Sequence, residues 1–485
     1  MRYKNYIGGR WVVPSSGNYF DSSNPHNKKS LGKFPKSNEK DVIAAIDSAA
    51  TVYEQWKQVP APKRGEILLH IAALLRKDKE RLARIMTLEM GKVLNEARGD
   101  VQEAIDVAEY MAGEGRRLFG QTTPSELPDK ACMTIRVPIG VVALITPWNF
   151  PIAIPSWKLM PALVCGNTVV FKPSSDTPLC AIALVKICEK AGVPKGVVNL
   201  VMGDGKRVGD VLLNDPRVRG ISFTGHRDTG KYLLANAGIK RIGLELGGKN
   251  PIIVMDDADL TLAVDGILWG GYGTTGQRCT ACSRVIVHRK VLKKVEQMLL
   301  KKIRKLRLGN GLDRKTDVGP LVNEAAAEKS MKYSLIGIKE GATLLCGGRP
   351  AKTSGYYFEP TLFTNVKPHM TIAREEIFGP IVSLISVKDL KEAIAVANGV
   401  EYGLVSSIYT KDIRNAYIAM TELETGITYV NSPTIGAEVH LPFGGVKGTG
   451  NGVREAGMLG IDEFSEVKTI YVDYSGRLQK AQGIE

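Results

Sequence analysis

The feature that most constrains the fold is an alternation of continuous apolar runs with helical stretches between residues 141 and 254. Apolar strands that alternate with helices form parallel sheets with both faces covered. Such sheets bind ligands beyond the carboxyl ends of their strands, so function is expected in the loops there. The predicted strands are 141–145, 168–171, 197–201, 220–223 and 251–254, with helices over 181–189 and 229–237 among those between them.

Four loops at these carboxyl ends carry candidate binding residues, at 146–151, 172–175, 203–209 and 224–226. The third loop reads G-x-G-x-x-x-G, one residue longer than the dinucleotide fingerprint, and any tight strand-to-helix turn needs glycines. The fourth loop begins a helix directly after a strand, so its free amides could hold a phosphate.

A second conspicuous stretch, residues 276–282, places Cys279 between glycine-rich sequence and a β-branched run. A thiol is a strong nucleophile only as thiolate, and the neighbouring Arg278 could favour that form. Three interpretations are open at this point: a nucleophile, a CxxC pair with Cys282 for redox or zinc chemistry, or a buried apolar side chain. Zinc needs a second pair of ligands, and the sequence has no other CxxC or close histidine pair.

A catalytic cysteine needs a base, and none of the six histidines has an obvious site context apart from His440 in a loop. Glu245 is the other candidate, because it is a lone acid in an apolar, glycine-flanked stretch. Burial would raise its pKa toward neutrality, which suits a general base. The alternative is a buried carboxylate held by a lysine or by backbone donors.

Composition excludes several classes of protein. A chain of 485 residues with 44% hydrophobic and 24% charged residues predicts two or three globular domains. No apolar run is long enough for a membrane helix and the N-terminus lacks a signal-peptide core, so no membrane partner is expected. Seven dispersed cysteines predict the cytoplasm rather than a disulfide framework. The net charge of +15 is also dispersed, without interleaved aromatics, so no nucleic-acid partner is expected.

Seven motifs occur in a fixed order along the chain. They span 147–151, 171–174, 223–225, 244–249, 276–279, 376–380 and 442–445. Together they resemble the aldehyde dehydrogenase superfamily, and the similarity runs from Tyr6 to about Tyr474. The resemblance implies NAD(P)-dependent oxidation of an aldehyde to a carboxylic acid, without a metal and without a catalytic histidine.

The resemblance implies three catalytic residues. Cys279 would attack the carbonyl to give a thiohemiacetal and then a thioester. Asn149 and the backbone N–H of Cys279 would stabilise the oxyanion. Glu245 would activate Cys279 and later the hydrolytic water. Cys282 would be structural, or a neighbour that could be oxidised against Cys279.

The resemblance also implies the cofactor site. Lys172 and Glu376 would hold the ribose hydroxyls, and Phe378 would pack near the nicotinamide ribose. The other implied cofactor-binding residues are Trp148, Thr224, Gly225 and Leu246.

Two positions depart from the family pattern. Ser175 stands where NAD-preferring members commonly have glutamate, and a serine beside Lys172 tolerates or binds a 2′-phosphate. NADP is therefore the expected cofactor, with NAD as the second option, and the adjacent Asp176 tempers that preference. His226 replaces a serine common at the helix start, which affects the details of pyrophosphate binding.

The substrate is expected to meet apolar walls formed by Phe150, Trp157 and Phe443. The segment 432–441 resembles that of members acting on semialdehydes and sugar-derived aldehydes, such as 2,5-dioxopentanoate dehydrogenases. Arg278 could meet a substrate carboxylate or form a structural salt bridge, and both interpretations are open.

The expected fold class is α/β and aldehyde-dehydrogenase-like, in three parts. A Rossmann-type cofactor domain takes 1–118 and 140–246, and an α/β catalytic domain takes 247–447. A small β oligomerisation element takes 119–139 and 464–485, and its terminal strand, an edge, predicts a homodimer or homotetramer. The alternative functions are a thiol–disulfide oxidoreductase using Cys279 and Cys282, and a non-enzymatic binding protein on the same scaffold.

Overall fold

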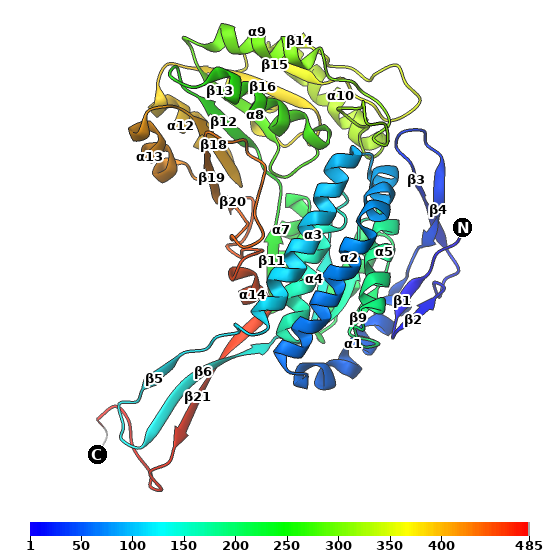
Figure 1. Ribbon diagram of the computed structural model, residues 1–485, viewed down its shortest axis with the longest axis vertical. Helices are drawn as coiled ribbons and strands as arrows, with labels where there is room; N and C mark the ends of the chain where they lie inside the picture. The colour runs from blue at the N-terminus through cyan, green and yellow to red at the C-terminus, as the bar shows by residue number, and fades with distance from the viewer. Residues whose placement is uncertain (484–485) are drawn as a thin grey trace.

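The computed structural model describes residues 1–483, and within them the strands form two seven-stranded sheets and a projecting three-stranded arm (Figure 1). In the first sheet, five adjacent strands pair in parallel and two N-terminal strands add to it antiparallel. Its order is β11 (Arg241–Glu245), β10 (Val218–Thr224), β7 (Val141–Ile145), β8 (Thr168–Lys172), β9 (Val198–Leu200), β1 (Asn5–Ile7) and β2 (Arg10–Val12).

Four of the five predicted parallel strands lie in this sheet, and the fifth, which falls within the range 247–447 predicted as a separate domain, lies in the second sheet. The strand predicted at 251–254 is β12 (Asn250–Val254), which belongs to the second sheet. The missing strand of the first sheet is β11, whose apolar run is broken by Gly243. A Cβ at Gly243 would lie 1.9 Å from Glu463 Oε1, so a larger residue here would displace the Glu463 carboxylate.

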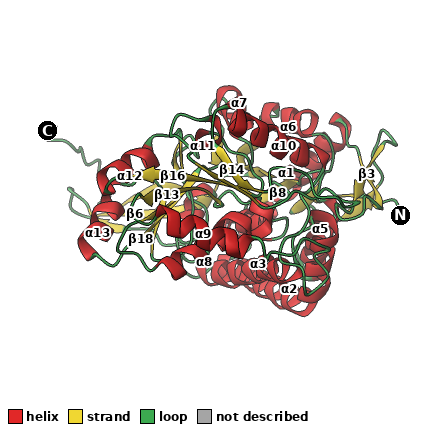
Figure 2. Cartoon of the chain, turned by 90° about the horizontal axis from the view of Figure 1, so that it is seen from above, coloured by secondary structure: helices red, strands yellow, loops and turns green. Residues whose placement is uncertain are grey.

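The second sheet is parallel except at β14, and helices pack against it (Figure 2). Its order is β14 (Thr343–Cys346), β15 (Thr361–Thr364), β16 (Ile381–Val387), β13 (Cys282–His288), β12, β18 (Val405–Tyr409) and β19 (Ile427–Val430). The helices of this part are α8 (Leu260–Tyr272), α9 (Leu292–Ile303), α10 (Glu324–Lys339), α11 (Thr371–Arg374), α12 (Leu390–Asn398) and α13 (Ile413–Glu422). The short strands β17 (Tyr402–Gly403) and β20 (Val446–Lys447) pair antiparallel.

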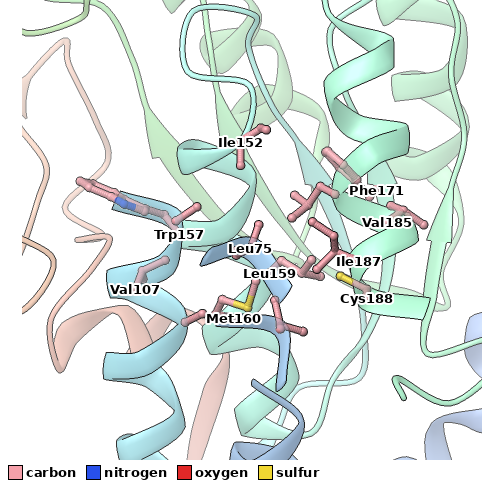
Figure 3. Packing of buried hydrophobic residues seen from close by; sticks show 14 of the residues in the cluster. Leu75, Val107, Ile152, Trp157, Leu159, Met160, Phe171, Val185, Ile187 and Cys188 are labelled. Atoms are coloured by element: carbon pink, nitrogen blue, oxygen red, sulfur yellow. The ribbon is translucent and has the colours of Figure 1, made fainter. Parts of the chain in front are cut away.

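The first sheet packs against long amphipathic helices and one helix that is buried almost all round. All residues of α4 (Ala153–Cys165) except Ile154 are buried, as its apolar sequence requires. Figure 3 shows Trp157, Leu159 and Met160 of this helix among side chains from neighbouring helices and β8. The other helices are α1 (Glu39–Gln58), α2 (Ala61–Met90), α3 (Leu94–Glu114), α5 (Pro178–Lys190), α6 (Gly205–Asn214) and α7 (Arg227–Asn236), and β3 (Tyr19–Ser23) forms a hairpin with β4 (Ser30–Pro35).

After the second sheet, the chain returns to the first. Leu246 N–H donates to the carbonyl of Thr449 at 2.7 Å, and Asn451 Oδ1 accepts from Leu244 N–H at 3.1 Å. These bonds attach the returning segment to the strand that ends in Glu245. The helix α14 (Leu459–Glu463) then packs against α4.

The arm projects away from both sheets (Figure 1). It consists of β5 (Thr122–Pro124), β6 (Lys130–Pro138) and β21 (Ser465–Asp473). The terminal strand β21 pairs antiparallel with β6 of its own chain along its whole length. In the described part of the chain its other edge carries no strand. Residues 484–485 of the expected oligomerisation element lie outside the described residues.

Residues 1–483 include no helix long and apolar enough to cross a bilayer. They also include no group of three or more His, Cys, Asp or Glu side chains arranged to hold a metal ion.

Candidate active site

A cavity of about 950 Å³ brings together strand-end residues of the first sheet and residues from α8 and the loops beside the second sheet. Cys279 and Glu245, the predicted nucleophile and base, both line it. The predicted cofactor-binding residues Thr224 and Leu246 line it as well. Three aromatic side chains form part of its wall, namely Phe150, Trp157 and Phe443. Trp157 and Phe443 meet edge to face with ring centroids 5.0 Å apart.

Cys279 follows a short, irregular turn between α8 and β13. This 3₁₀ turn, η1 (Gly273–Gly276), contains three consecutive residues with positive φ. Gly276 is one of them, and a Cβ there would lie 2.2 Å from the carbonyl oxygen of Gly379. Asn250 Nδ2 then donates to the carbonyl oxygen of Cys279 at 2.7 Å. Cys279 is therefore held by its backbone while its side chain remains half-buried at the cavity.

The two cysteines of the CxxC sequence have different surroundings. Burial, and after it the carboxylate of Glu245, raises the pKa of Cys279 to about 12. Its thiol is therefore protonated at neutral pH, so reaction requires a base. Cys282 lies buried at the start of β13, where its Sγ lies 3.4 Å from the carbonyl oxygen of Arg284. Within residues 1–483 all seven cysteines are free.

Asn149 is buried in the loop that follows β7. Its Nδ2 donates to the carbonyl oxygen of Gln277 at 3.1 Å, two residues before the nucleophile. Its Oδ1 is buried and has no hydrogen-bond partner among the described residues. Asn149 therefore holds an amide group next to the Cys279 loop, where an oxyanion donor is required.

Glu245 is the last residue of β11 and is 3% exposed. Both of its carboxylate oxygens are buried without a hydrogen-bond partner among residues 1–483. Burial, and after it the negative charge of Glu455, raises the pKa of Glu245 well above its usual value. A Cβ at Gly444 would lie 2.4 Å from Glu245 Oε1, so glycine there admits the carboxylate.

A buried charged cluster beside Glu245 was missed by sequence reasoning. Lys158 of α4 is ion-paired with Glu455, which also lines the cavity, and Lys158 Nζ donates to Ser222 Oγ at 2.8 Å. Glu463 is buried nearby, and burial raises its pKa to about 7. Lys158 is a lone charge in an otherwise apolar helix, which could have marked it from sequence. Glu455 gave no such signal, because nearly 300 residues separate it from Lys158.

Arg278 takes part in an ion pair with Glu96 of α3, whose Oε1 lies 3.4 Å from its guanidinium. Arg278 Nε donates to Thr274 Oγ1 at 2.9 Å. Its guanidinium carbon lies 5.2 Å from the ring centroid of Phe150, and Arg278 also lines the cavity. The structural salt bridge expected as one option therefore exists, within reach of the cavity.

Two predicted cofactor-binding residues lie outside this cavity: Lys172, which ends β8, and Ser175, which follows that strand. Lys172 is 5% exposed, its Nζ donates to the carbonyl oxygen of Pro173 at 3.0 Å, and burial lowers its pKa to about 8. Ser175 Oγ donates to the carbonyl oxygen of Gly203 at 3.0 Å, which joins the second and third loops. Asp176 accepts from Asn323 Nδ2 at 3.0 Å.

A second group of predicted cofactor-binding residues surrounds the link between the two sheets. Glu376 Oε1 accepts from Gly248 N–H at 2.8 Å, and burial raises its pKa above the usual value. A Cβ at Gly247 would lie 2.4 Å from Glu376, so only glycine permits this approach. Trp148 and Phe378 meet edge to face with ring centroids 5.5 Å apart.

Thr224 is the last residue of β10, and Gly225 follows it two residues before α7 begins at Arg227. His226 is the N-cap of α7 and its Nδ1 accepts from Asp228 N–H at 3.3 Å. The helix N-terminus, the Lys172 ammonium and the Glu376 carboxylate match the phosphates and ribose hydroxyls of a dinucleotide. The residues present therefore fit the expected cofactor.

The model of the "Aldehyde dehydrogenase family" matches residues 11–470. An α-ketoglutarate semialdehyde dehydrogenase of Haloferax volcanii is 42% identical over 479 residues, covering 97% of this chain and 99% of that protein. A 2,5-dioxopentanoate dehydrogenase of Saccharolobus solfataricus is 40% identical, covering 96% and 99%. A crystal structure of Staphylococcus aureus betaine aldehyde dehydrogenase with NAD⁺ superposes with a TM-score of 0.96 at 38% identity, covering 98% of this chain and 97% of that one. The chain belongs to the aldehyde dehydrogenase family, and it is an NAD(P)-dependent enzyme that oxidises an aldehyde to a carboxylic acid.

Proposed function

We propose that Cys279, Glu245 and Asn149 carry out this oxidation on a semialdehyde that bears a carboxylate, with NADP as the preferred cofactor. The observation that carries the catalytic assignment is the meeting of Cys279 and Glu245 in one cavity, with the Asn149 amide bound to the loop before the nucleophile. The side chains supply a nucleophile, a base and an oxyanion donor.

In the proposed reaction, Glu245 takes the proton of the Cys279 thiol and Sγ bonds to the aldehyde carbon. The resulting oxyanion accepts from Asn149 Nδ2–H and from Cys279 N–H. A nicotinamide bound at this site would supply the acceptor for the hydride that leaves this carbon, which would give a thioester. Glu245 then releases the thiol proton to solvent and removes a proton from water, whose oxygen bonds to the thioester carbon. The C–S bond breaks, the acid leaves, and the thiolate of Cys279 takes the proton back from Glu245.

Glu245 requires movement or a bridging water to reach the thiol. Its Oε1 lies against Gly444, and no hydrogen bond joins it to Cys279 among residues 1–483. General bases are often poorly aligned before substrate binds. We therefore expect its carboxylate to turn toward Cys279 or act through water.

The preference for NADP is supported by the site around Lys172. Ser175 is small and uncharged, and its hydroxyl is turned to the carbonyl of Gly203. The neighbouring carboxylate of Asp176 is held by Asn323 Nδ2 at 3.0 Å and by Ser174 Oγ at 3.2 Å. A 2′-phosphate would therefore meet the Lys172 ammonium without a glutamate at position 175 to repel it.

The choice of a carboxylate-bearing substrate is supported by the names of the two relatives and by Arg278. Most acidic groups that line the cavity have cationic partners: Arg278 pairs with Glu96, Arg307 with Asp317 and Lys302 with Asp265. Burial raises the pKa of Glu103 to about 8, so this wall residue is largely uncharged at neutral pH. Arg278 lies on the wall next to Cys279, and its guanidinium, although ion-paired with Glu96, is the cationic group proposed to meet the substrate carboxylate.

The remaining assignments concern assembly and location. We propose a homodimer or homotetramer built through the arm, because the outer edge of β21 and exposed side chains such as Tyr471 invite pairing. The cytoplasm is the proposed compartment, because seven free thiols are typical of a reducing environment.

The decisive experiment is nicotinamide reduction by the purified protein with aliphatic, aromatic, semialdehyde and hydroxyaldehyde substrates, each with NADP and NAD. We expect the highest kcat/KM with a carboxylate-bearing semialdehyde and NADP. Turnover with NAD alone would reject the cofactor proposal, and equal rates with uncharged aldehydes would reject the substrate proposal.

Two cysteine variants separate the proposal from thiol–disulfide chemistry. Cys279→Ser should abolish aldehyde oxidation, since the hydroxyl is a far weaker nucleophile. Cys282→Ser should leave kcat almost unchanged, because Cys282 lies buried in β13. A near-total loss of activity in Cys282→Ser, measured as NADPH formation, would contradict a structural role for Cys282.

A further inference from the structure

The backbone just before the nucleophile is held in an unfavourable conformation. Thr274 and Thr275 have φ angles of +51° and +58°. These left-handed values are outliers for β-branched residues, because the side chain crowds the backbone there. Such conformations persist only where the surrounding structure holds them, and they cluster at functional sites. The contacts that hold this turn therefore bear on where Cys279 is placed.

Glu96, in the first turn of α3, provides several of these contacts. Its Oε1 accepts from Thr274 N–H at 2.8 Å, and its Oε2 accepts from the Thr274 hydroxyl at 3.2 Å. The same carboxylate is ion-paired with Arg278 at 3.4 Å. Glu96 has 9% side-chain exposure, so water screens these contacts little. One side chain thus binds both ends of segment 274–278.

Other contacts also hold this turn. Gln277 Nε2 donates to the carbonyl oxygen of Thr274 at 3.2 Å, and Gln277 Oε1 accepts from Val322 N–H at 3.0 Å. Thr275 Oγ1 donates to the carbonyl oxygen of Gly319 at 3.0 Å. Arg278 Nε donates to Thr274 Oγ1 at 2.9 Å, which joins the two ends directly. None of these bonds involves the N–H of Thr274, whose acceptor is Glu96 Oε1.

We propose that Glu96 is a positioning residue that holds Thr274 in its left-handed conformation and thereby sets the place at which Cys279 meets the aldehyde. It also holds the Arg278 guanidinium at the cavity wall, 5.2 Å from the Phe150 ring and 6.0 Å from the Trp269 ring. This inference rests on the proposed function in one respect, which is that Cys279 is the nucleophile.

The first test replaces Glu96 and measures the chemical step. Glu96→Ala should lower kcat by roughly 100-fold, because a misplacement of about 1 Å can cost that much. The KM for the dinucleotide should stay unchanged, since Glu96 contacts the nucleophile loop and not the predicted cofactor residues. The rate of Cys279 alkylation by iodoacetamide, followed by mass spectrometry across pH 6 to 10, should change in the same variant.

The second test is rescue by glycine. Glycine adopts left-handed φ without the steric penalty of threonine, so position 274 would no longer need an external clamp. Glu96→Ala combined with Thr274→Gly should therefore recover roughly 10-fold or more of the lost kcat. A loss that is equal in the single and double variants would overturn the proposal, because the effect would then not pass through Thr274.

Glu109→Ala is the matched control, because Glu109 lies on the same helix and is exposed in an ion pair with Arg76. Its kcat should equal that of the unaltered enzyme. Glu96→Gln keeps an acceptor for Thr274 and loses the charge toward Arg278, so an intermediate kcat is expected even where Glu96→Ala folds poorly. Unchanged kcat and alkylation in both Glu96 variants would refute the inference. Activity retained in Cys279→Ser would refute the proposed function, while the alkylation data would still report on the turn.

Discussion

At the scale of single residues, the proposed nucleophile Cys279 and the proposed base Glu245 are expected to determine how the rate of the enzyme responds to pH. Both groups have raised pKa values, chiefly because both are removed from water. The thiol is protonated at rest, and the base is active only when it has lost its own proton. The reactive ionisation state of this pair is therefore reached more easily as pH increases.

Glu245→Gln tests this relation. The amide cannot take a proton, so kcat should decrease by roughly 100-fold or more. In the unaltered enzyme kcat/KM should increase with pH above neutrality, and the variant should lose the part of that increase due to Glu245. Stopped-flow and steady-state rates between pH 6 and 10 measure both effects, and an unchanged profile would remove Glu245 as the base.

Ser175 is the residue on which the choice of cofactor is expected to depend. Ser175→Glu would place a carboxylate where a 2′-phosphate is proposed to lie, and like charges in contact cost several kcal/mol. The ratio of kcat/KM for NADP to that for NAD should decrease by roughly 10-fold or more. Ser175→Gln has the same length without the charge and is the control. An unchanged ratio in the glutamate variant would place the phosphate elsewhere.

At the scale of secondary-structure elements, α5 depends on a side chain from another helix. Its N-cap residue, Thr177, makes no side-chain capping bond. Glu89, near the end of α2, takes that role: its two oxygens accept from Leu179 N–H at 2.8 Å and Cys180 N–H at 2.9 Å. These bonds join the end of α2 to the start of α5.

Glu89→Ala should lower the free energy of unfolding by about 1–3 kcal/mol, because it leaves buried backbone donors unpaired. Burial raises the pKa of Glu89 to about 7, above its value of about 4.5 in the unfolded chain. Protonation of Glu89 therefore stabilises the folded chain, and this stabilisation is complete below pH 4.5 and is lost as pH increases through 7. The difference between the two proteins in urea unfolding should be larger at pH 5.5 than at pH 8. A constant difference would contradict this linkage.

The same scale shows what the sequence could predict. Continuous apolar runs identified β7, β8 and β10, because parallel strands buried on both faces need such runs. The run at 241–245 was missed, since Gly243 and Glu245 serve contacts with distant residues rather than strand propensity. The local pattern therefore predicted most of the sheet and the two loops that contribute Phe150 and Thr224 to the cavity. It could not give Lys158 with Glu455, or Glu96 with Thr274, because those pairs form only in the folded chain.

At the scale of the whole molecule, the arm is the part with the least contact to the rest of the chain. Val467 and Tyr471 of β21 are 63% and 64% exposed. Replacing both with aspartate should shift the protein from an oligomer to a monomer at micromolar concentration, because charge would replace the apolar contact surface proposed for a second copy. Sedimentation velocity measures the change, and Leu335→Asp on α10, also exposed, is the control. An unchanged mass would place the subunit interface elsewhere.

The return of the chain from the second sheet to the first has a consequence for synthesis. A ribosome releases β11 and Lys158 long before it releases Glu455 and the segment at 449–451 that bonds to that strand. Until then the edge of the first sheet lacks its cover, and the ammonium of Lys158 lacks its ion-pair partner. The N-terminal half therefore cannot reach its final packing before residues 449–455 have been synthesised. Completion of the cavity wall beside Glu245 depends on that late segment of the chain.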